Sequence, residues 1–301
     1  MFRHIGVSID SDDQYSDAII RALEISHGSG ARISLWYAQP RPEGPLAQLH
    51  CEHRADEVLT RTGAAAHAMG IPSRAGALFA EQPVREILNA AQRHGCDVIV
   101  TTSGPETHAI DLISLAHVPV LTVGPGCSPP PIAALELLHV EYRRLTGLLH
   151  QWLCLLSGWH AQGKPDLRPH RAGMQAVVEH IRGTVHPLQR CKEASLYGRL
   201  RRRFEIVRAE IDELLLLGRC EHELFAEVEC RASEPLDHES TVAELSSALE
   251  RYARHVWTMR GREEGVILPA ARRQLTAAAW DRIHAELFNV LRARDGAAGG
   301  A

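Results

Sequence analysis

Short apolar runs alternate with amphipathic segments in the first part of the chain. The apolar runs predict buried strands over residues 2–9, 32–38, 74–79, 97–101 and 118–123. Between them, apolar side chains recur at three- and four-residue steps, which predicts helices over residues 15–27, 46–69 and 84–93. Strands and helices in strict alternation need crossover connections. The pattern therefore predicts an α/β domain with a five-stranded, parallel, doubly wound sheet.

The composition of the sequence changes at residues 124–131, GPGCSPPP, which are rich in glycine and proline. Consecutive prolines stiffen the chain and end strand pairing, so we expect a domain of residues 1–124 followed by a linker over 125–131. Beyond the linker, long amphipathic segments predict helices over 132–156, 172–202, 204–232 and 239–273, with a shorter fifth helix over 275–291. Four long helices in series predict an all-α domain, an up-down four-helix bundle over 132–295, and we expect 296–301 to be a disordered tail.

Composition narrows the classes of protein that the chain can represent. The formal net charge of −4 excludes a strong general attraction to nucleic acid or to an anionic membrane surface. No apolar stretch approaches the length of a membrane span, and the first residues lack the pattern of a signal peptide. The seven cysteines show no CxxC spacing, which is typical of reduced thiols. We therefore expect a cytoplasmic protein that binds neither nucleic acid nor membrane.

The stretch over residues 252–269, YARHVWTMRGREEGVILP, combines helical spacing with side chains that bind metals. Tyr252, His255, Met259 and Glu263 lie on one stripe of the predicted helix. A histidine followed four residues later by a carboxylate would direct two ligands at one ion, but Met259 stands four residues after His255. A metal site, a degenerate site and an ordinary core all remain open at this point.

A second set of candidates follows the strands of the predicted sheet. Ligands of parallel α/β folds bind beyond the carboxyl ends of the strands, where Asp10 and residues 101–106 and 124–126 lie. The segments GVSIDSDD, EQPVREILNAAQRHGCDVIV and HVPVLTVGPG resemble the universal stress protein family. This resemblance implies a homodimer that pairs through the last strand, and an ATP or AMP site in the members that bind nucleotides.

The resemblance makes Asp10, Gly124 and Gly126 the candidate nucleotide-binding residues. Asp10 is equally suited to cap the helix that follows the first strand. The glycine loop that cradles phosphates in nucleotide-binding members is largely missing here. Only Gly104 remains, and Pro105 has no amide hydrogen to donate.

The helical half carries a second resemblance. The segments LLHVEYRRLTGLL, KEASLYGRL, CEHELFAEV and MRGREEGVILPAARRQLTAAAWDRI resemble the hemerythrin-like (HHE) family of four-helix bundles. The resemblance implies a di-iron centre held by histidines and carboxylates. Of the implied ligand positions, Glu193 and His222 keep a residue that binds metal. Thr258 and Arg262 stand where the family has a histidine and an acid, so the site is expected to be degenerate.

Four further residues are metal candidates only if the site has shifted along the helices. Three of them, His139, His186 and His255, each lie three residues before a lost ligand position, and Glu263 follows Arg262 directly. Because adjacent helices of an up-down bundle are antiparallel, the shift moves His139 away from His186 and His255 by about 9 Å. The pair His186 and His255 could still share a ligand.

Three hypotheses for function follow from these observations. The first is a non-enzymatic, cytoplasmic stress-response or regulatory protein that dimerises and binds an unknown protein partner or a small ligand. In this hypothesis there is no catalytic residue, no cofactor and no surviving di-iron centre. The alternative is a metal-binding hemerythrin-like sensor or oxidoreductase for oxygen, nitric oxide or iron, with a di-iron or mononuclear iron site. The second alternative is a nucleotide-binding stress sensor.

Overall fold

The computed structural model divides the chain into two compact units. The first unit comprises Met1–Pro129 together with Trp257–Val266, and the second comprises Pro130–Val256 and Ile267–Ala301. The structure describes residues 2–9, 17–103, 108–124, 132–159, 163, 166–203, 205–236 and 238–298. The expected linker 125–131, Asp10 and Gly126 lie outside these residues.

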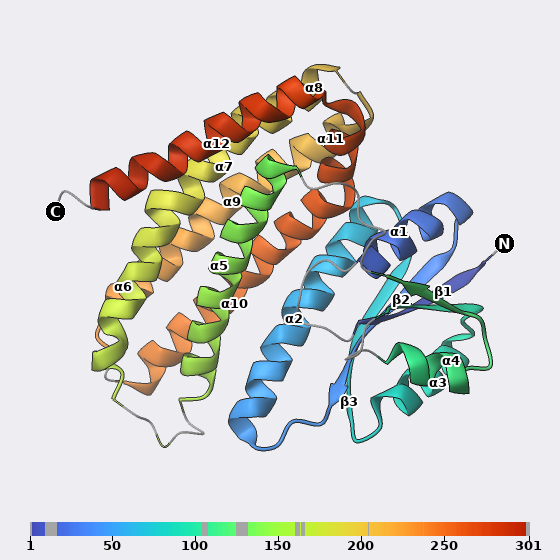
Figure 1. The fold of residues 1–301 in the computed structure, drawn as a ribbon. Helices are drawn as coiled ribbons and strands as arrows, with labels where there is room; N and C mark the ends of the chain where they lie inside the picture. Colours follow the sequence, from blue (N-terminus) through green and yellow to red (C-terminus); the bar gives the residue numbers. More distant parts are fainter. Residues whose placement is uncertain are drawn as a thin grey trace. The chain divides into compact units, whose positions relative to one another are not determined.

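The first unit contains the predicted parallel sheet (Figure 1). Its strands lie in the order β3-β2-β1-β4-β5 and are parallel at every pairing. All six residues of β1 are buried because β1 is central and both sheet faces are covered. The strands are β1 (His4–Ile9), β2 (Arg32–Pro40), β3 (Ser73–Ala80), β4 (Val98–Thr102) and β5 (Val120–Val123).

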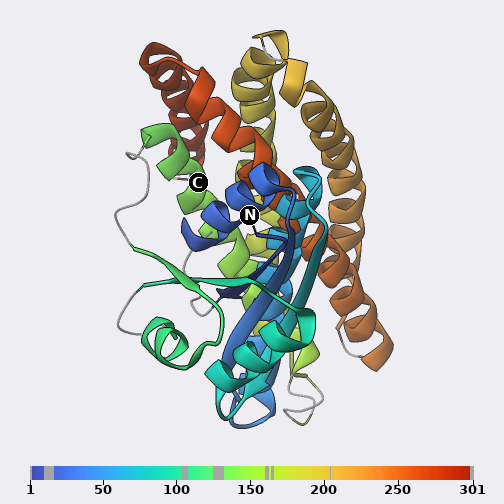
Figure 2. The ribbon, with the colours of Figure 1, turned by 90° about the vertical axis from the view of Figure 1, so that its right-hand side faces the viewer.

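Helices cover both faces of this sheet, which confirms the α/β prediction (Figure 2). Ile5 and Val7 of β1 pack in one core with residues of α1 and α2, and Trp36 and Ile99 pack in another with residues of α3 and α4. The short helix α4 was not predicted. The four helices are α1 (Asp17–Ser29), α2 (Pro45–Ala68), α3 (Pro83–His94) and α4 (Ala109–Leu115).

The segment Trp257–Val266 belongs to the first unit because it packs on α2. A Cβ atom on Gly261 would lie 2.0 Å from the carbonyl oxygen of Arg61, and one on Gly265 would lie 2.9 Å from the Cα of Ala65. Only glycine allows two backbones to approach this closely.

Four charged side chains are buried at the same place. Arg61 pairs with Glu57 at 2.9 Å and with Glu264 at 3.5 Å, and Arg260 Nε pairs with Glu264 at 2.9 Å. Two guanidinium groups and two carboxylates balance one another, as buried charges require. Glu264 thus pairs with arginines while buried, and Glu263 is also buried, at 2% exposure.

The second unit is helical over nearly all of its described length, as the sequence predicts for this part of the chain. Helix α12 is longer than the expected fifth helix and reaches into the expected tail. The α-helices are α5 (Ala133–Ser157), α6 (Arg171–His180), α7 (His186–Lys192), α8 (Gly198–Arg203), α9 (Arg208–Ser233), α10 (Glu239–Arg262), whose end lies in the first unit, α11 (Leu268–Gln274) and α12 (Ala277–Ala298), with 3₁₀ turns η1 (Arg168–His170) and η4 (Glu205–Val207). Within the described residues, every helix is too short or too polar to cross a membrane.

Three π-helical turns interrupt what the sequence predicts as continuous α-helices: η2 (Ile181–Val185), η3 (Glu193–Tyr197) and η5 (Glu263–Ile267). Both η2 and η5 end two residues before a proline, Pro187 and Pro269. Proline has no N–H group, so the carbonyl four residues before it loses its helical partner, and a wider turn accommodates the gap. Each π turn rotates the residues that follow, relative to the 3.6-residue spacing.

Candidate metal centre

Three side chains that can bind a metal meet in the second unit: His186, Glu221 and His222. His186 is the first residue of α7, directly after η2, and the other two are neighbours on α9. One potential ligand atom from each lies within 4.8 Å of the other two. The two imidazole rings are stacked, with centroids 4.4 Å apart and planes inclined by 19°.

Hydrogen bonds orient two of these groups. His186 Nε2 lies 3.1 Å from Glu221 Oε1. His222 Nδ1 donates to the carbonyl oxygen of Gly218 at 2.7 Å, one helical turn earlier. Since Nδ1 carries the hydrogen in this bond, Nε2 of His222 has the lone pair that can bind a metal, and Nδ1 itself lies 3.3 Å from Glu221 Oε2.

Burial is uneven across the cluster. The side chains of His186 and Glu221 are 9% and 7% exposed, whereas that of His222 is 48% exposed. Phe225 packs edge-on against His186, at 4.8 Å between centroids, and against Tyr252 at 5.9 Å. The cluster is therefore closed on its aromatic side and open beside His222.

The environment of Glu221 favours the charged form of its carboxylate. Burial raises the pKa of Glu221, but the hydrogen bond and charge of His186, together with the nearby Tyr252 hydroxyl and the His222 ring, lower it more, so the net pKa lies below its ordinary value. Burial, together with the nearby Glu221 carboxylate, raises the pKa of Tyr252 well above its ordinary value. A neutral tyrosine thus faces an ionised carboxylate.

Two imidazoles and a carboxylate are a donor set that suits Zn²⁺, Fe²⁺, Co²⁺ or Ni²⁺. Ligand atoms that share such an ion at bonds of about 2.1 Å lie about 3.0–3.5 Å apart. His186 Nε2 and Glu221 Oε1 already meet this spacing, at 3.1 Å, and the three residues offer ligand atoms that lie within 4.8 Å of one another. Three protein ligands leave at least one coordination position for water or another small ligand.

The other predicted ligands lie apart from this cluster. Glu193 begins η3 and accepts a hydrogen bond from Gln189 Nε2 at 2.8 Å. His255 Nε2 lies 2.8 Å from the carbonyl oxygen of Leu217. His139 lies on α5, and Glu263 is buried in the first unit. Thus His186, a candidate only for a site shifted along the helices, meets His222, whereas the pairing of His186 with His255 is not what the cluster contains.

Glu221 was missed as a ligand, although it stands in the quoted CEHELFAEV segment. Consecutive helical residues point in directions about 100° apart, so Glu221 and His222 do not share a face by spacing alone. In the structure, His222 Nδ1 nevertheless lies 3.3 Å from Glu221 Oε2, although Glu221 is buried and His222 is half exposed. His186 reaches both from the turn that η2 displaces.

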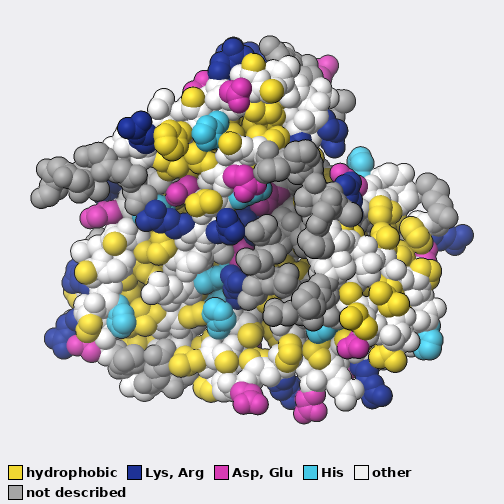
Figure 3. Space-filling model, in the orientation of Figure 1, with side chains coloured by type: hydrophobic (Ala, Val, Ile, Leu, Met, Phe, Trp, Pro, Cys, Tyr) yellow, Lys and Arg dark blue, Asp and Glu magenta, His cyan; other side chains and the backbone are white. Residues whose placement is uncertain are grey.

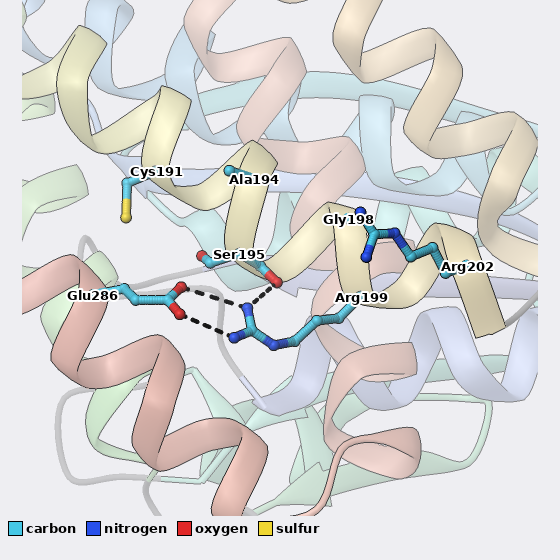
Figure 4. A pocket seen from close by; sticks show the side chains of 7 residues that line it. All are labelled: Cys191, Ala194, Ser195, Gly198, Arg199, Arg202 and Glu286. Carbon is cyan, nitrogen blue, oxygen red and sulfur yellow. Dashed lines mark hydrogen bonds and ion pairs between the residues drawn. The ribbon is translucent and has the colours of Figure 1, made fainter.

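A hollow elsewhere in the helical unit is lined by an ion pair (Figure 4). It encloses about 450 Å³ beside Cys191 and Arg202. Arg199 of α8 pairs with both carboxylate oxygens of Glu286 on α12, at 2.9 and 3.4 Å, and donates to the Ser195 carbonyl at 2.6 Å. Because this guanidinium is fully engaged, the hollow offers no unpaired charge from Arg199 to a ligand.

Of the nucleotide candidates, only Gly124 is described. It directly follows β5, and a Cβ atom there would lie 3.2 Å from Ser103 Oγ. Ser103 itself donates its backbone N–H to the Val123 carbonyl at 2.9 Å. Gly124 therefore lies where β4 and β5 end, at the carboxyl edge where such folds bind ligands.

Comparison with known proteins decides the nature of the first unit. The model of the universal stress protein family matches residues 1–123. These residues form a universal stress protein domain. The resemblance of the second unit to hemerythrin-like proteins has no such support and stays a prediction.

Solved structures of universal stress proteins are similar to part of the chain. A protein of this family from Burkholderia pseudomallei is 26% identical and covers 40% of this chain and 94% of its own, with a TM-score of 0.34. A universal stress protein from Archaeoglobus fulgidus, solved with dAMP, is 21% identical over 40% of this chain and 96% of its own, also at 0.34. A universal stress protein in complex with cAMP is 18% identical over 40% of this chain and 97% of its own, at 0.33. No curated protein matches.

Proposed function

We propose that this chain is a non-enzymatic stress-response regulator whose helical unit binds one divalent transition-metal ion through His186, Glu221 and His222. The observation that carries the proposal is the convergence of these three side chains from two helices. The partly exposed His222 gives the ion access to solvent, as a site that senses metal availability requires. The three residues differ from the di-iron ligands that the hemerythrin-like resemblance implies: of the two surviving ligand positions His222 takes part, whereas Glu193 accepts a hydrogen bond from Gln189.

Metal stoichiometry tests this function. The metal-free chain is titrated with Zn²⁺ by calorimetry and with Co²⁺ by visible absorption, and we expect one ion per chain. His186→Ala should weaken binding at least about 100-fold, because it removes one of three ligands. His255→Gln serves as the matched control and should leave binding unchanged.

Two results would contradict the proposal. If the wild-type chain binds no Zn²⁺ or Co²⁺ at millimolar concentration, the cluster is a structural ion pair. If the purified protein holds two iron ions and His255→Gln removes them, the alternative of a hemerythrin-like di-iron sensor is correct.

We infer that the universal stress protein domain pairs with a second copy through β5. This strand lies at the edge of the sheet, and Leu121 on it is 39% exposed. The neighbouring helix α4 exposes Ile110, Ile113 and Leu115 by 71%, 58% and 54%. An unpaired strand edge beside exposed apolar side chains favours strand pairing between two copies.

Light scattering on a sizing column tests the dimer. The wild-type chain should elute at twice its mass of 33.2 kDa, and Ile113→Lys should shift it towards the monomer. Leu46→Lys introduces the same charge at a side chain that is 47% exposed on α2, and should leave the dimer intact. A wild-type monomer at tens of micromolar would exclude this partner.

Charge gives no support for nucleic acid as a partner. On the face drawn in Figure 3, basic and acidic side chains are interspersed, without a continuous basic patch. The nucleotide hypothesis stays a prediction for the first unit. A thermal-shift titration with ATP and AMP tests it, and an unchanged melting temperature would exclude it.

A further inference from the structure

Tyr252 on α10 is a buried polar side chain beside the metal cluster, and it is not one of the three ligands. Its exposure is 0%, and the centroid of its ring lies 5.9 Å from that of Phe225 on α9. Phe225 in turn packs against the His186 ring, at 4.8 Å between centroids. A chain of aromatic contacts therefore joins Tyr252 to the cluster.

The pairing of α9 with α10 places Tyr252 opposite Glu221. His255 of α10 donates to the Leu217 carbonyl of α9, whereas Tyr252, three residues earlier, contacts Phe225, which follows Leu217 by eight residues. The two helices are therefore antiparallel at this contact. Glu221 lies midway between Leu217 and Phe225, four residues from each, so it shares their face of α9.

The two side chains also act on each other electrostatically. Burial is the largest influence on the pKa of each group. Beyond burial, the Glu221 carboxylate raises the pKa of Tyr252, and the Tyr252 hydroxyl joins His186 in lowering the pKa of Glu221. These reciprocal effects agree with the helix pairing, and both indicate that the hydroxyl faces the carboxylate.

The hydrogen bond between these two groups is not complete in this arrangement. Within the described residues, no atom meets the geometry of an ordinary hydrogen bond with the Tyr252 hydroxyl. A buried donor of this kind costs free energy until an acceptor reaches it. The Glu221 carboxylate, which accepts hydrogen bonds at either oxygen, is the group that the hydroxyl faces.

Both oxygens of this carboxylate also contact the other two ligands. Oε1 of Glu221 lies 3.1 Å from His186 Nε2, and Oε2 lies 3.3 Å from His222 Nδ1. In metal sites, a carboxylate ligand is itself held in place by a hydrogen bond from a neighbouring group. Tyr252 is not a ligand, so its hydroxyl can hold the carboxylate while the imidazoles bind the ion.

We propose that Tyr252 is the positioning residue of Glu221: its hydroxyl donates a hydrogen bond to the carboxylate and holds it towards His186 and His222. The inference rests on the proposed function, in which Glu221 is a metal ligand. It adds a supporting group from α10 to a site whose ligands lie on α7 and α9.

Titration of the full chain with metal measures the effect on the site. Tyr252→Phe removes only the hydroxyl and should weaken Zn²⁺ binding at least about tenfold, because the ligating carboxylate loses the bond that orients it. The visible absorption of bound Co²⁺ should change for the same reason. A purely structural role of Tyr252 would lower stability without moving this absorption.

Tyr197→Phe is the matched control for this substitution. Tyr197 is 1% exposed, and its ring centroid lies 5.7 Å from Lys192 Nζ. The control thus also removes the hydroxyl of a buried tyrosine in the helical unit. It should leave the Zn²⁺ affinity and the Co²⁺ absorption unchanged.

A double-mutant cycle without metal tests the contact itself. Tyr252→Phe and Glu221→Met, singly and together, are compared by chemical denaturation in the presence of a chelator. Because the two side chains interact, the unfolding constant of the double variant should depart from the product of the single effects by at least about threefold. With Tyr197→Phe in place of Tyr252→Phe, the effects should multiply to within about twofold.

The two arms separate failure of this inference from failure of the metal site. An additive cycle, or a Tyr252→Phe chain with the Zn²⁺ affinity and Co²⁺ absorption of the wild type, would overturn the positioning role and leave the three-ligand site standing. A wild-type chain that binds neither ion would overturn the proposed function. The cycle would then still decide whether the Tyr252 hydroxyl bonds to Glu221.

Discussion

Each unit contains a stacked pair of histidines, and the two pairs differ in what surrounds them. His4 and His94 in the first unit have ring centroids 6.3 Å apart, and His186 and His222 in the second have centroids 4.4 Å apart. In both pairs the planes are inclined by 19°. Stacking alone therefore does not separate a structural pair from one that can bind a ligand.

In the first pair, groups of the protein itself form hydrogen bonds with the ring nitrogens. His4 Nδ1 donates to the His94 carbonyl at 2.8 Å, and His4 Nε2 accepts from Ser34 Oγ at 2.9 Å. His94 Nδ1 donates to the same Ser34 oxygen at 3.1 Å. The groups bonded to these ring nitrogens are a carbonyl and a hydroxyl, and Arg32 also donates to the His94 carbonyl at 3.3 Å. Within the described residues, none of these ring nitrogens is bonded to a carboxylate that would attract a cation.

In the second pair, one carboxylate contacts a nitrogen of each ring, and one ring reaches the surface. Glu221 contacts His186 at 3.1 Å and His222 Nδ1 at 3.3 Å. A negative charge among imidazoles, with one open side, attracts a cation. The comparison teaches that the partner of each nitrogen, rather than burial or stacking, decides what a histidine pair can do.

The largest expected effect comes from removing the charge in the second pair. Glu221→Gln keeps the shape of the side chain but should weaken Zn²⁺ binding at least about 100-fold, equal to about 2.8 kcal/mol. Calorimetric titration measures the change. Unaltered affinity would mean that the carboxylate is no ligand, and the contrast between the two pairs would fail.

The next effect comes from breaking the first pair. Ser34→Ala leaves His4 Nε2 buried without its donor and should lower the free energy of unfolding by about 2 kcal/mol. Chemical denaturation measures the loss, and Zn²⁺ affinity should stay that of the wild type. A parallel loss of Zn²⁺ affinity would show that the two pairs are coupled.

The smallest expected effect is a dependence of stability on pH. Burial lowers the pKa of His4 below 6.5; the His94 carbonyl and Asp97 oppose this shift, whereas Arg32 and the His94 ring add to it. The folded state therefore binds the proton less readily than the unfolded state. The stability from neutral His4 is present above pH 6.5 and is lost as the pH falls through the lowered pKa.

Denaturation curves at pH 7.5 and at pH 5 test this dependence. Stability should be lower at pH 5, and Ser34→Ala should reduce the difference because His4 loses its buried partner. An equal pH dependence in the wild type and in Ser34→Ala would assign the effect to other groups. Asp97 titrates at lower pH still, since its hydrogen bonds from the Arg3 and His4 backbone outweigh its burial and lower its pKa.

The sheet was predictable because local pattern and fold agree in the first unit. Central parallel strands such as β1 are buried at every position and mostly apolar, and such short apolar runs are recognisable in the sequence. The helical segments were likewise predictable from spacing. The π-helical turns were not, since a period of 3.6 residues contains no information about a local insertion, although Pro187 and Pro269 mark two of them.

The candidate site was predictable only in part for the same reason. His186 and His222 were both named, but the assumed regular helix kept His186 a full turn away from the other ligands. Glu221 was missed because its contact with His186 depends on how α7 packs against α9 rather than on spacing along one helix. Glu193 keeps the residue type of a family ligand position, but in the structure its carboxylate accepts a hydrogen bond from Gln189 and is not part of the cluster.

The discontinuity of the first unit bears on how the chain folds during synthesis. Domains usually fold as they emerge, from the amino terminus onward. Here Arg61 and Glu57 gain their buried partners from Arg260 and Glu264 only after the ribosome has passed residue 266. The first unit therefore becomes complete only after most of the helical unit has been translated, and until then the face of α2 that packs on Trp257–Val266 lacks its partner.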